Sequence, residues 1–239
     1  MQHNTNVITM DKSYKEMLSG INEELQEAIE ITAHDFNEVN EMIKRYYQSV
    51  DSKKATNAND VVNEKLQSMI TNLQHHDIFR QRVEHVVLVH QKLTADEWQL
   101  DFVELVFHLH VFQAMTIELD LLKAISSIAD TLLDVRNQFP DVIKYCKIEN
   151  CFLQTNRIKE IIKKTVSILQ TAGGNLKQLP LSPLTMSQLK RIESLYTMGS
   201  ERVVLGWFID SIPSGSWEDL LLHYQEEIER LNIENAELF

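Results

Sequence analysis

Apolar residues recur at three- and four-residue steps along most of this 239-residue chain. The first such stretch, from Lys12 to Val50, carries one narrow apolar stripe, and acidic residues fill its other faces. The stripe comprises Tyr14, Leu18, Ile21, Leu25, Ala28, Phe36, Val39, Ile43 and Tyr46. This period is typical of an α-helix with one buried face, close to a coiled-coil seam, so we expect one long helix here.

The same period predicts two further long helices. The second is expected from about Asp60 to Leu93, after the polar segment DSKKATNAND. A third should then follow as far as about Gln138, because Thr94 and Glu97 form a capping box and the proline after Phe139 disfavours helical geometry. Apolar residues occupy several faces of this third helix, which predicts a central position.

Shorter helices are expected toward the end of the chain. A fourth helix, from 141 to 172, should end at the Gly-Gly pair that follows it. A fifth is predicted from Thr185 or Ser187 through Ile209, with a break at Pro213. A short amphipathic helix from 217 to 231 then leads to the terminal segment NIENAELF.

These patterns predict an all-α fold, an elongated antiparallel bundle of long helices with shorter helices at the C-terminal end. The chain contains only 6 Gly and 4 Pro, whereas a sandwich or barrel needs many turns. We expect a long-helix bundle over residues 1–175, and C-terminal helices with a partner-binding tail over residues 176–239. Long helices with a single seam need a partner surface to cover them, so a homodimer is expected.

The charge balance excludes several functional classes. Asp and Glu number 35 against 23 Lys and Arg, a formal net charge of −12, and no basic run offers the counterion release that nucleic acid or an anionic membrane requires. The first residues lack the apolar core of a signal peptide, and no stretch of about 20 apolar residues is uninterrupted, so no membrane insertion is expected. Cys146 and Cys151 fit neither a disulfide framework nor a zinc spacing, which favours reduced thiols and a cytoplasmic protein.

The apolar pattern of the second helix is interrupted once. Its stripe runs through Val62, Leu66, Met69 and Leu73 and resumes with Val83 and Val87. Between them, helical spacing places Asp77, Gln81 and Glu84 on one ridge, with His76 and Arg80 on the next. Because each unpaired buried polar group costs about 1–3 kcal/mol, either the seam opens to solvent here or a functional site is built here.

This segment, LQHHDIFRQRVEHV, resembles the active-site helix of the CheZ family of chemotaxis phosphatases. That family has an aspartate and a glutamine four residues apart, in a Q-D-x-x-G-Q setting on a long bundle helix. Asp77 and Gln81 match the pair in type and spacing, whereas Arg80 stands where the family has glycine. The resemblance covers about fourteen residues.

Two other segments resemble proteins from the same cellular setting. The string YTMGSER and the terminal ENAELF are similar to segments of soluble, helical, chemotaxis-associated bacterial proteins. The end of the chain is also similar to the CheZ tail, a short acidic and apolar peptide that binds the response regulator CheY. In this chain the apolar anchors of such a peptide would be Ile233, Ala236, Leu238 and Phe239.

The resemblance implies a phosphatase that stimulates dephosphorylation of a phosphorylated CheY-like response regulator. Gln81 would orient the attacking water, and Asp77 would pair with the lysine that receiver domains place beside their phosphate. Arg80 and Glu84 would contact the partner, while Arg82 is expected to be a solvated surface charge. The Mg²⁺ would sit on the receiver domain, so no cofactor is expected on this chain.

Two other functional classes remain open. A non-enzymatic signalling or scaffold bundle, like the cytoplasmic regions of chemoreceptors, would use the polar break as a partner contact or a register device. Whether Asp77 and Gln81 face solvent or are paired inside the bundle discriminates it from the phosphatase. A metal-binding bundle is the other class. The repeated Glu-x-x-His spacing of di-iron bundles is absent, and Glu104 and His108 have no matching partner helix, so no metal site is expected.

Overall fold

The computed structural model describes residues 7–8, 10–49, 57–138, 152, 154–174, 183–193, 196, 199–214 and 216–238. The helices are α1 (Lys12–Ser49), α2 (Asn57–Leu73), α3 (His75–Ala95), α4 (Leu100–Gln138), α5 (Thr155–Ala172), α6 (Pro183–Glu193), α7 (Gly199–Ser214) and α8 (Trp217–Leu238). Two-residue strands, β1 (Val7–Ile8) and β2 (Trp98–Gln99), pair antiparallel. The predicted all-α class is therefore confirmed.

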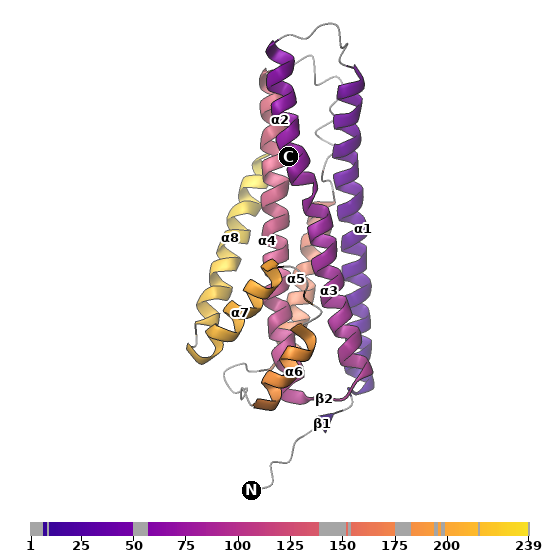
Figure 1. Ribbon diagram of the computed structural model, residues 1–239, viewed down its shortest axis with the longest axis vertical. Helices are drawn as coiled ribbons and strands as arrows, with labels where there is room; N and C mark the ends of the chain where they lie inside the picture. Colours follow the sequence, from indigo (N-terminus) through magenta and orange to yellow (C-terminus); the bar gives the residue numbers. More distant parts are fainter. Residues whose placement is uncertain are drawn as a thin grey trace.

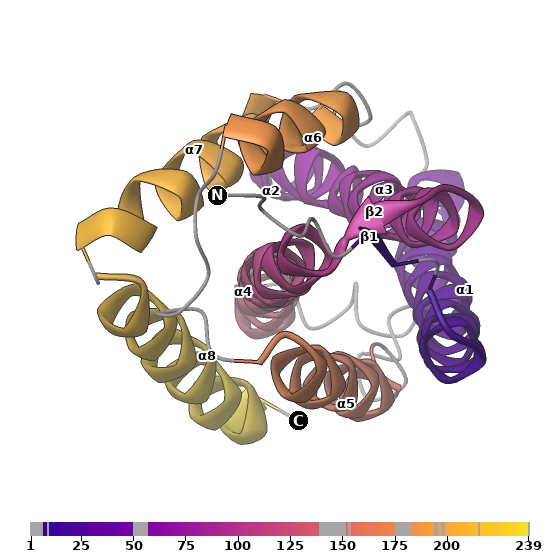
Figure 2. The same ribbon diagram turned by 90° about the horizontal axis from the view of Figure 1, so that it is seen from below.

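Helix α4 lies at the centre, and the other helices surround it (Figures 1 and 2). It packs against α2, α3, α5, α6, α7 and α8. Every side chain from Leu105 to Leu119 is buried, which accounts for the apolar residues on several of its faces. Burial of this continuous apolar surface, at about 25 cal/mol per Å², is the main source of stability for the fold.

Among the described residues, one helix is long and apolar enough to cross a membrane, and it coincides with α4. In its most apolar window, 94% of the residues are buried inside the protein. The apolar character of this helix is therefore used in packing against its neighbours, as in the core helix of a soluble protein.

The helices on the two sides of α4 differ in length and direction. On one side α1 packs against α3 and α5, and α2 continues into α3 along the long axis of the molecule (Figure 1). On the other side α7 and α8 form a V whose inner face covers α4. Phe112 of α4 contacts Phe208 of α7 and Tyr224 of α8, with ring centroids 5.3 and 6.4 Å apart.

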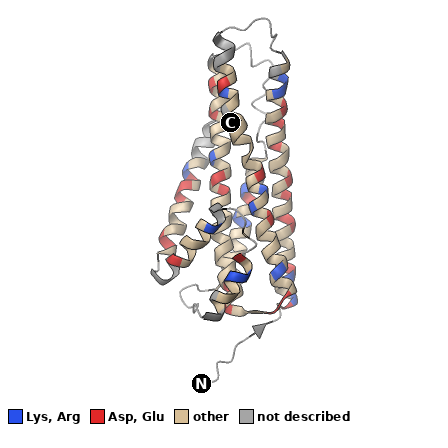
Figure 3. Cartoon of the chain, in the orientation of Figure 1, with Lys and Arg blue, Asp and Glu red and all other residues tan. Residues whose placement is uncertain are grey.

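Charged side chains are distributed along the outer faces of the described helices. Figure 3 shows acidic and basic residues interspersed on α1 and α3, with no continuous basic stretch. Ion pairs link neighbouring helices: Arg157 of α5 binds Glu27 of α1 through two nitrogens, at 2.8 and 2.9 Å, and Lys164 pairs with Glu24. Such exposed pairs contribute little to stability, because solvent screens their charges.

Two predicted helices are divided in the structure. The predicted second helix breaks at Gln74, whose N–H bonds the carbonyl of Thr71 three residues back, so α2 and α3 are separate. The predicted fifth helix is split into α6 and α7 around Tyr196, a fully buried aromatic residue. The last helix continues to Leu238, beyond the expected end. The first part of the predicted fourth helix lies outside the described residues.

Candidate functional site

The candidate residues Asp77, Gln81 and Glu84 form a ridge on the solvent-facing side of α3. Gln81 is exposed, and the side chains of Asp77 and Glu84 are 50% and 47% exposed. Of the two sequence interpretations, the seam that opens to solvent is the one found. We call these three residues the polar ridge.

The buried side of α3 explains why the polar ridge is tolerated. Phe79 and Val83 are buried, and the buried set continues through Val86, Val89 and Leu93. The shift at Gln74 turns the apolar stripe of α2 onto this set, so the polar residues do not interrupt the packing. The stability of α3 therefore does not depend on the polar ridge, and that face is free to contact a partner.

Arg80 lies between the two carboxylates of the polar ridge. Its guanidinium donates to Asp77 Oδ1 at 3.2 Å and pairs with Glu84 Oε1 at 3.5 Å. All three side chains are about half exposed, and pairs of this kind contribute about 0–1 kcal/mol. The arginine that replaces the family's glycine can therefore swing away from Asp77 at little cost when a partner supplies another cation.

An exposed apolar side chain follows the polar ridge on α3. Leu88 is 45% exposed, and helical spacing places it on the line of Asp77, Gln81 and Glu84. A second exposed apolar side chain, Ile70 with 36% exposure, lies on α2, before the break at Gln74. A polar ridge with an apolar end suits contact with another protein.

Arg82 is not a surface charge, contrary to the sequence expectation. Its side chain is only 12% exposed, and its Nη1 donates to Asp120 Oδ2 of α4 at 2.6 Å. The residue points inward because it lies about 100° around α3 from Gln81, on the side that packs against α4. Arg82 therefore ties the ridge helix to α4 and is not available to assist chemistry on the polar ridge.

We expect Asp120→Ala to lower the free energy of unfolding by about 1.5–3 kcal/mol, because it removes a charged hydrogen-bond acceptor of the mostly buried guanidinium. Glu84→Ala removes an exposed partner of Arg80 and is the matched control, with an expected change below about 1 kcal/mol. Urea unfolding followed by circular dichroism measures both. Equal effects of the two variants would contradict the structural role of the Arg82–Asp120 pair.

The predicted tail residues lie at the end of α8. Positions 233, 236 and 238 belong to its last turns as a continuation of the helix, and Phe239 lies outside the described residues. The end of α8 lies on the α5 side of α4, whereas α3 lies on the other side (Figure 2). The tail and the polar ridge of one chain are therefore two separate surfaces.

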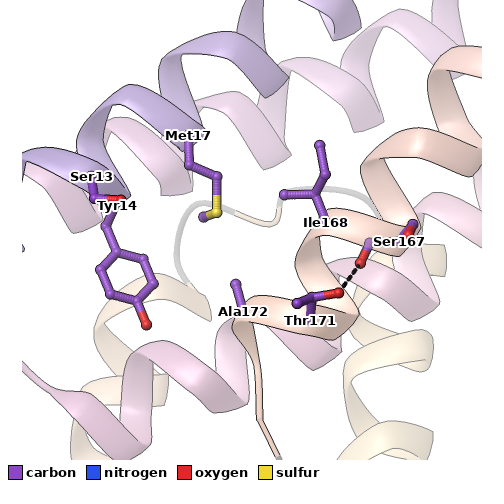
Figure 4. A pocket seen from close by; sticks show the side chains of 7 residues that line it. All are labelled: Ser13, Tyr14, Met17, Ser167, Ile168, Thr171 and Ala172. Atoms are coloured by element: carbon purple, nitrogen blue, oxygen red, sulfur yellow. Dashed lines mark hydrogen bonds between the residues drawn. The ribbon is translucent and has the colours of Figure 1, made fainter.

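Two hollows in the described surface do not contain the candidate residues. One of about 330 Å³ lies between α1 and α5 and is lined by Ser13, Tyr14, Met17, Ser167, Ile168, Thr171 and Ala172 (Figure 4). The Thr171 hydroxyl donates a hydrogen bond to the carbonyl of Ser167, at 2.8 Å. Another, of about 700 Å³, lies between α1 and α3. Because Asp77 and Gln81 lie on an exposed helix face, a protein surface is a better substrate for them than a small molecule.

The Glu104 and His108 pair is used in helix packing. His108 Nε2 donates to the carbonyl of Gly173, at the C-terminal end of α5, at 2.9 Å. Burial lowers the pKa of His108 and raises the pKa of Glu104. Among the described residues, no group of three or more His, Cys, Asp or Glu side chains could hold a metal ion.

Sequence reasoning missed two buried acids, Asp35 of α1, which is 4% exposed, and Glu118 of α4. Glu118 of α4 is 8% exposed, and burial raises its pKa to about 7, against the opposing influence of Lys159 and Lys163 of α5. No sequence signal separates this residue from the exposed acids, because its burial comes from the packing of α5. It lies among buried neighbours on α4 and is not part of the polar ridge.

Comparison with known proteins provides no relative. No protein-family model, curated protein or solved structure matches this chain.

Proposed function

We propose that this protein is a cytoplasmic phosphatase that stimulates dephosphorylation of a phosphorylated CheY-like response regulator in bacterial chemotaxis. The observation that carries the proposal is the position of Asp77 and Gln81, one helical turn apart on an exposed face of a long helix. A receiver domain can approach this face directly. In the proposed form the chain is an elongated antiparallel bundle and a homodimer.

The chemistry of an aspartyl phosphate suits a glutamine. Its hydrolysis proceeds through a loose, in-line transition state, so catalysis consists mainly of positioning and charge stabilisation. The carboxamide oxygen of Gln81 accepts a hydrogen bond from the attacking water, and its NH₂ group donates to the phosphoryl oxygens. Unlike a carboxylate, the neutral amide does not repel the phosphoryl group.

Asp77 positions the partner in this proposal. Its carboxylate accepts from the Arg80 guanidinium at 3.2 Å in the free protein, and on binding it pairs with a lysine of the receiver domain instead. This exchange keeps one ion pair and costs little, because the Asp77–Arg80 pair is half exposed. The displaced Arg80 then stays close to Glu84 and can contact the partner. Mg²⁺ belongs to the receiver domain and needs no ligand from this chain.

The end of α8 supplies the second proposed contact. Ile233, Ala236, Leu238 and Phe239 form the apolar side of a short acidic segment at the end of the chain. Binding there would raise the local concentration of the receiver domain at the polar ridge, so weak tail binding has a large effect. Because the tail and ridge of one chain are separate, the tail holds the receiver without covering Gln81.

The decisive experiment follows the decay of a phosphorylated receiver domain from the same cell. We expect the wild-type protein to accelerate the decay, and Gln81→Ala to lower that acceleration by about 10²-fold or more, as when one transition-state hydrogen bond is removed. Gln91→Ala, at another exposed glutamine of α3, is the matched control and should leave the rate unchanged. Asp77→Ala should weaken binding of the receiver domain.

A wild-type protein that binds the receiver without changing its decay would contradict the proposal. In that case a non-enzymatic scaffold is the better account. Leu88 favours it as the second candidate, because this exposed apolar side chain makes the face of the polar ridge suitable for stable protein contact. A scaffold predicts that Leu88→Ser weakens partner binding while Gln81→Ala leaves every activity intact.

A further inference from the structure

A continuous chain of hydrogen bonds crosses the interior and joins four segments of the protein. Asn22 Oδ1 of α1 lies 2.7 Å from His90 Nδ1 of α3, and His90 Nε2 lies 2.9 Å from His110 Nδ1 of α4. His110 Nε2 lies 3.1 Å from the hydroxyl of Tyr196, in the connection between α6 and α7. His90, His110 and Tyr196 are each 0% exposed.

The direction of each hydrogen bond in this chain follows from which atoms can donate and which can only accept. An amide oxygen only accepts, so His90 Nδ1–H donates to Asn22, and His90 Nε2 must accept from His110 Nδ1–H. His110 Nε2 is then an acceptor, and the Tyr196 hydroxyl donates to it. Every ring nitrogen is used, and each histidine carries one proton. The chain is therefore complete when both rings are neutral.

Among the described residues, no acidic side chain pairs with either ring. From α1 the facing group is Asn22, from the α6–α7 connection it is Tyr196, and the two rings face each other with centroids 4.8 Å apart. The backbone carbonyl of Tyr196 accepts a hydrogen bond from a cation, Arg202, through its Nε at 3.2 Å. On α4 itself, His108 is directed to α5.

Burial lowers the pKa of His110 well below its usual value, and the neighbouring His90 lowers it further. Burial alone lowers the pKa of His90, to about 3. The two rings differ in what covers them. His110 lies directly beneath Tyr196, whereas His90 is held between Asn22 and His110. Displacement of the α6–α7 connection would therefore expose His110 first.

We infer that His110 and Tyr196 form a proton-operated latch that holds α6, α7 and α8 on the rest of the molecule. A proton from solvent binds His110 Nε2, the atom to which the Tyr196 hydroxyl donates in the closed state. The Nδ1–H bond to His90 is kept, and the new Nε2–H donates to water once the connection has moved away. The charge is then hydrated instead of buried.

The latch is reversible because apolar contacts favour the return of the C-terminal helices to α4. Phe208 and Tyr224 pack on Phe112 in the closed state, and this contact re-forms when His110 loses its proton. The latch controls the attachment of α6, α7 and α8 to the rest of the protein. It does not depend on any activity of Asp77 and Gln81.

Hydrogen exchange of the full-length protein between pH 7.5 and 5, read by mass spectrometry, tests this inference. After correction for the intrinsic pH dependence of exchange, opening of α6 and α7 should rise about tenfold per pH unit below pH ~6.5, because one histidine takes up a proton. Amides of α1 and α5 exchange by unfolding that exposes His90, His108 and His110, which take up protons, and Glu118, which releases one. Their opening should therefore rise more steeply, by up to about 100-fold per unit.

Three variants separate the latch from general acid instability. His110→Gln should abolish the pH dependence of opening in α6 and α7. Tyr196→Phe should increase this opening at every pH and leave its slope unchanged, since His110 remains. His223→Gln is the matched control, because His223 is a histidine of α8 that is already exposed in the closed state. It should preserve the slope.

Two results would overturn the latch. One is a wild-type protein in which α7 and α1 open together with the same slope, which would mean a single global transition. The other is an unchanged slope in His110→Gln, or its loss in His223→Gln, either of which would assign the proton to another group. The first comparison needs only the wild-type protein, so it decides even where a variant fails to fold.

Discussion

Replacing Trp98 with alanine should lower the free energy of unfolding by about 3–5 kcal/mol, the range for large aromatic side chains removed from a core. Trp98 lies in β2, between α3 and α4, and is 1% exposed. Its ring stacks on Phe102 with centroids 5.0 Å apart, and the guanidinium of Arg191 lies 4.4 Å above it. Its indole N–H donates to the Lys92 carbonyl at 3.2 Å.

The loss should be large because one side chain joins four elements. The indole donates a hydrogen bond to the C-terminal end of α3, packs on the first turn of α4 and contacts Arg191 of α6. The backbone of Trp98 belongs to the strand that pairs with β1. Urea unfolding followed by circular dichroism measures the change. Trp207→Ala is the control, because this tryptophan is 54% exposed. Its replacement should change the free energy of unfolding by no more than about 0.5 kcal/mol. Similar losses for both variants would contradict this packing.

Glu118→Gln should stabilise the protein at pH 8 by up to about 3 kcal/mol and leave its stability unchanged near pH 4. The folded pKa of Glu118, about 7, is raised above 4.5, the ordinary value that it has in the unfolded chain. The folded state therefore keeps a proton that the unfolded state releases. Stability is fully present below pH 4.5 and is lost as the pH rises through 7, at about 1.36 kcal/mol per unit of pKa difference.

Glutamine removes this loss because it is uncharged at every pH and has nearly the same shape. Urea unfolding of the wild type and Glu118→Gln at pH 4, 6 and 8 gives the difference directly. Glu16→Gln is the control, because Glu16 is 68% exposed on α1 and should show no pH-dependent difference. If Glu118→Gln is less stable than wild type at pH 8, attraction to Lys159 outweighs the burial of the carboxylate.

The helices that follow from a local pattern could be predicted from sequence. The apolar stripe of α1 placed its ends within one residue, and the many apolar faces of α4 indicated its central position. The division at Gln74 was not predictable, because its backbone stays close to helical geometry and the polar residues around it fit a continuous helix. The division at Tyr196 depends on partners far away in the chain, above all His110.

The candidate site shows the same limit. Helical spacing alone placed Asp77, Gln81 and Glu84 on one ridge, since that requires only the period of α3. Spacing could not show which way Arg82 points, because the answer depends on Asp120, 38 residues later. The burial of Glu118 and the hydrogen-bond chain through His90 likewise depend on contacts between helices. Side-chain roles set by a second helix are not encoded in the local pattern.

The central position of α4 also has a consequence for biosynthesis. Helices α2 and α3 leave the ribosome before α4, the helix on which both pack. At about 5–20 residues per second, the interval between the synthesis of Ala95 and Gln138 lasts about 2–9 s. During that interval α1, α2 and α3 have only one another to pack against. The nascent chain thus passes through a period of exposed apolar surface in which a chaperone that binds such surfaces would protect it from aggregation.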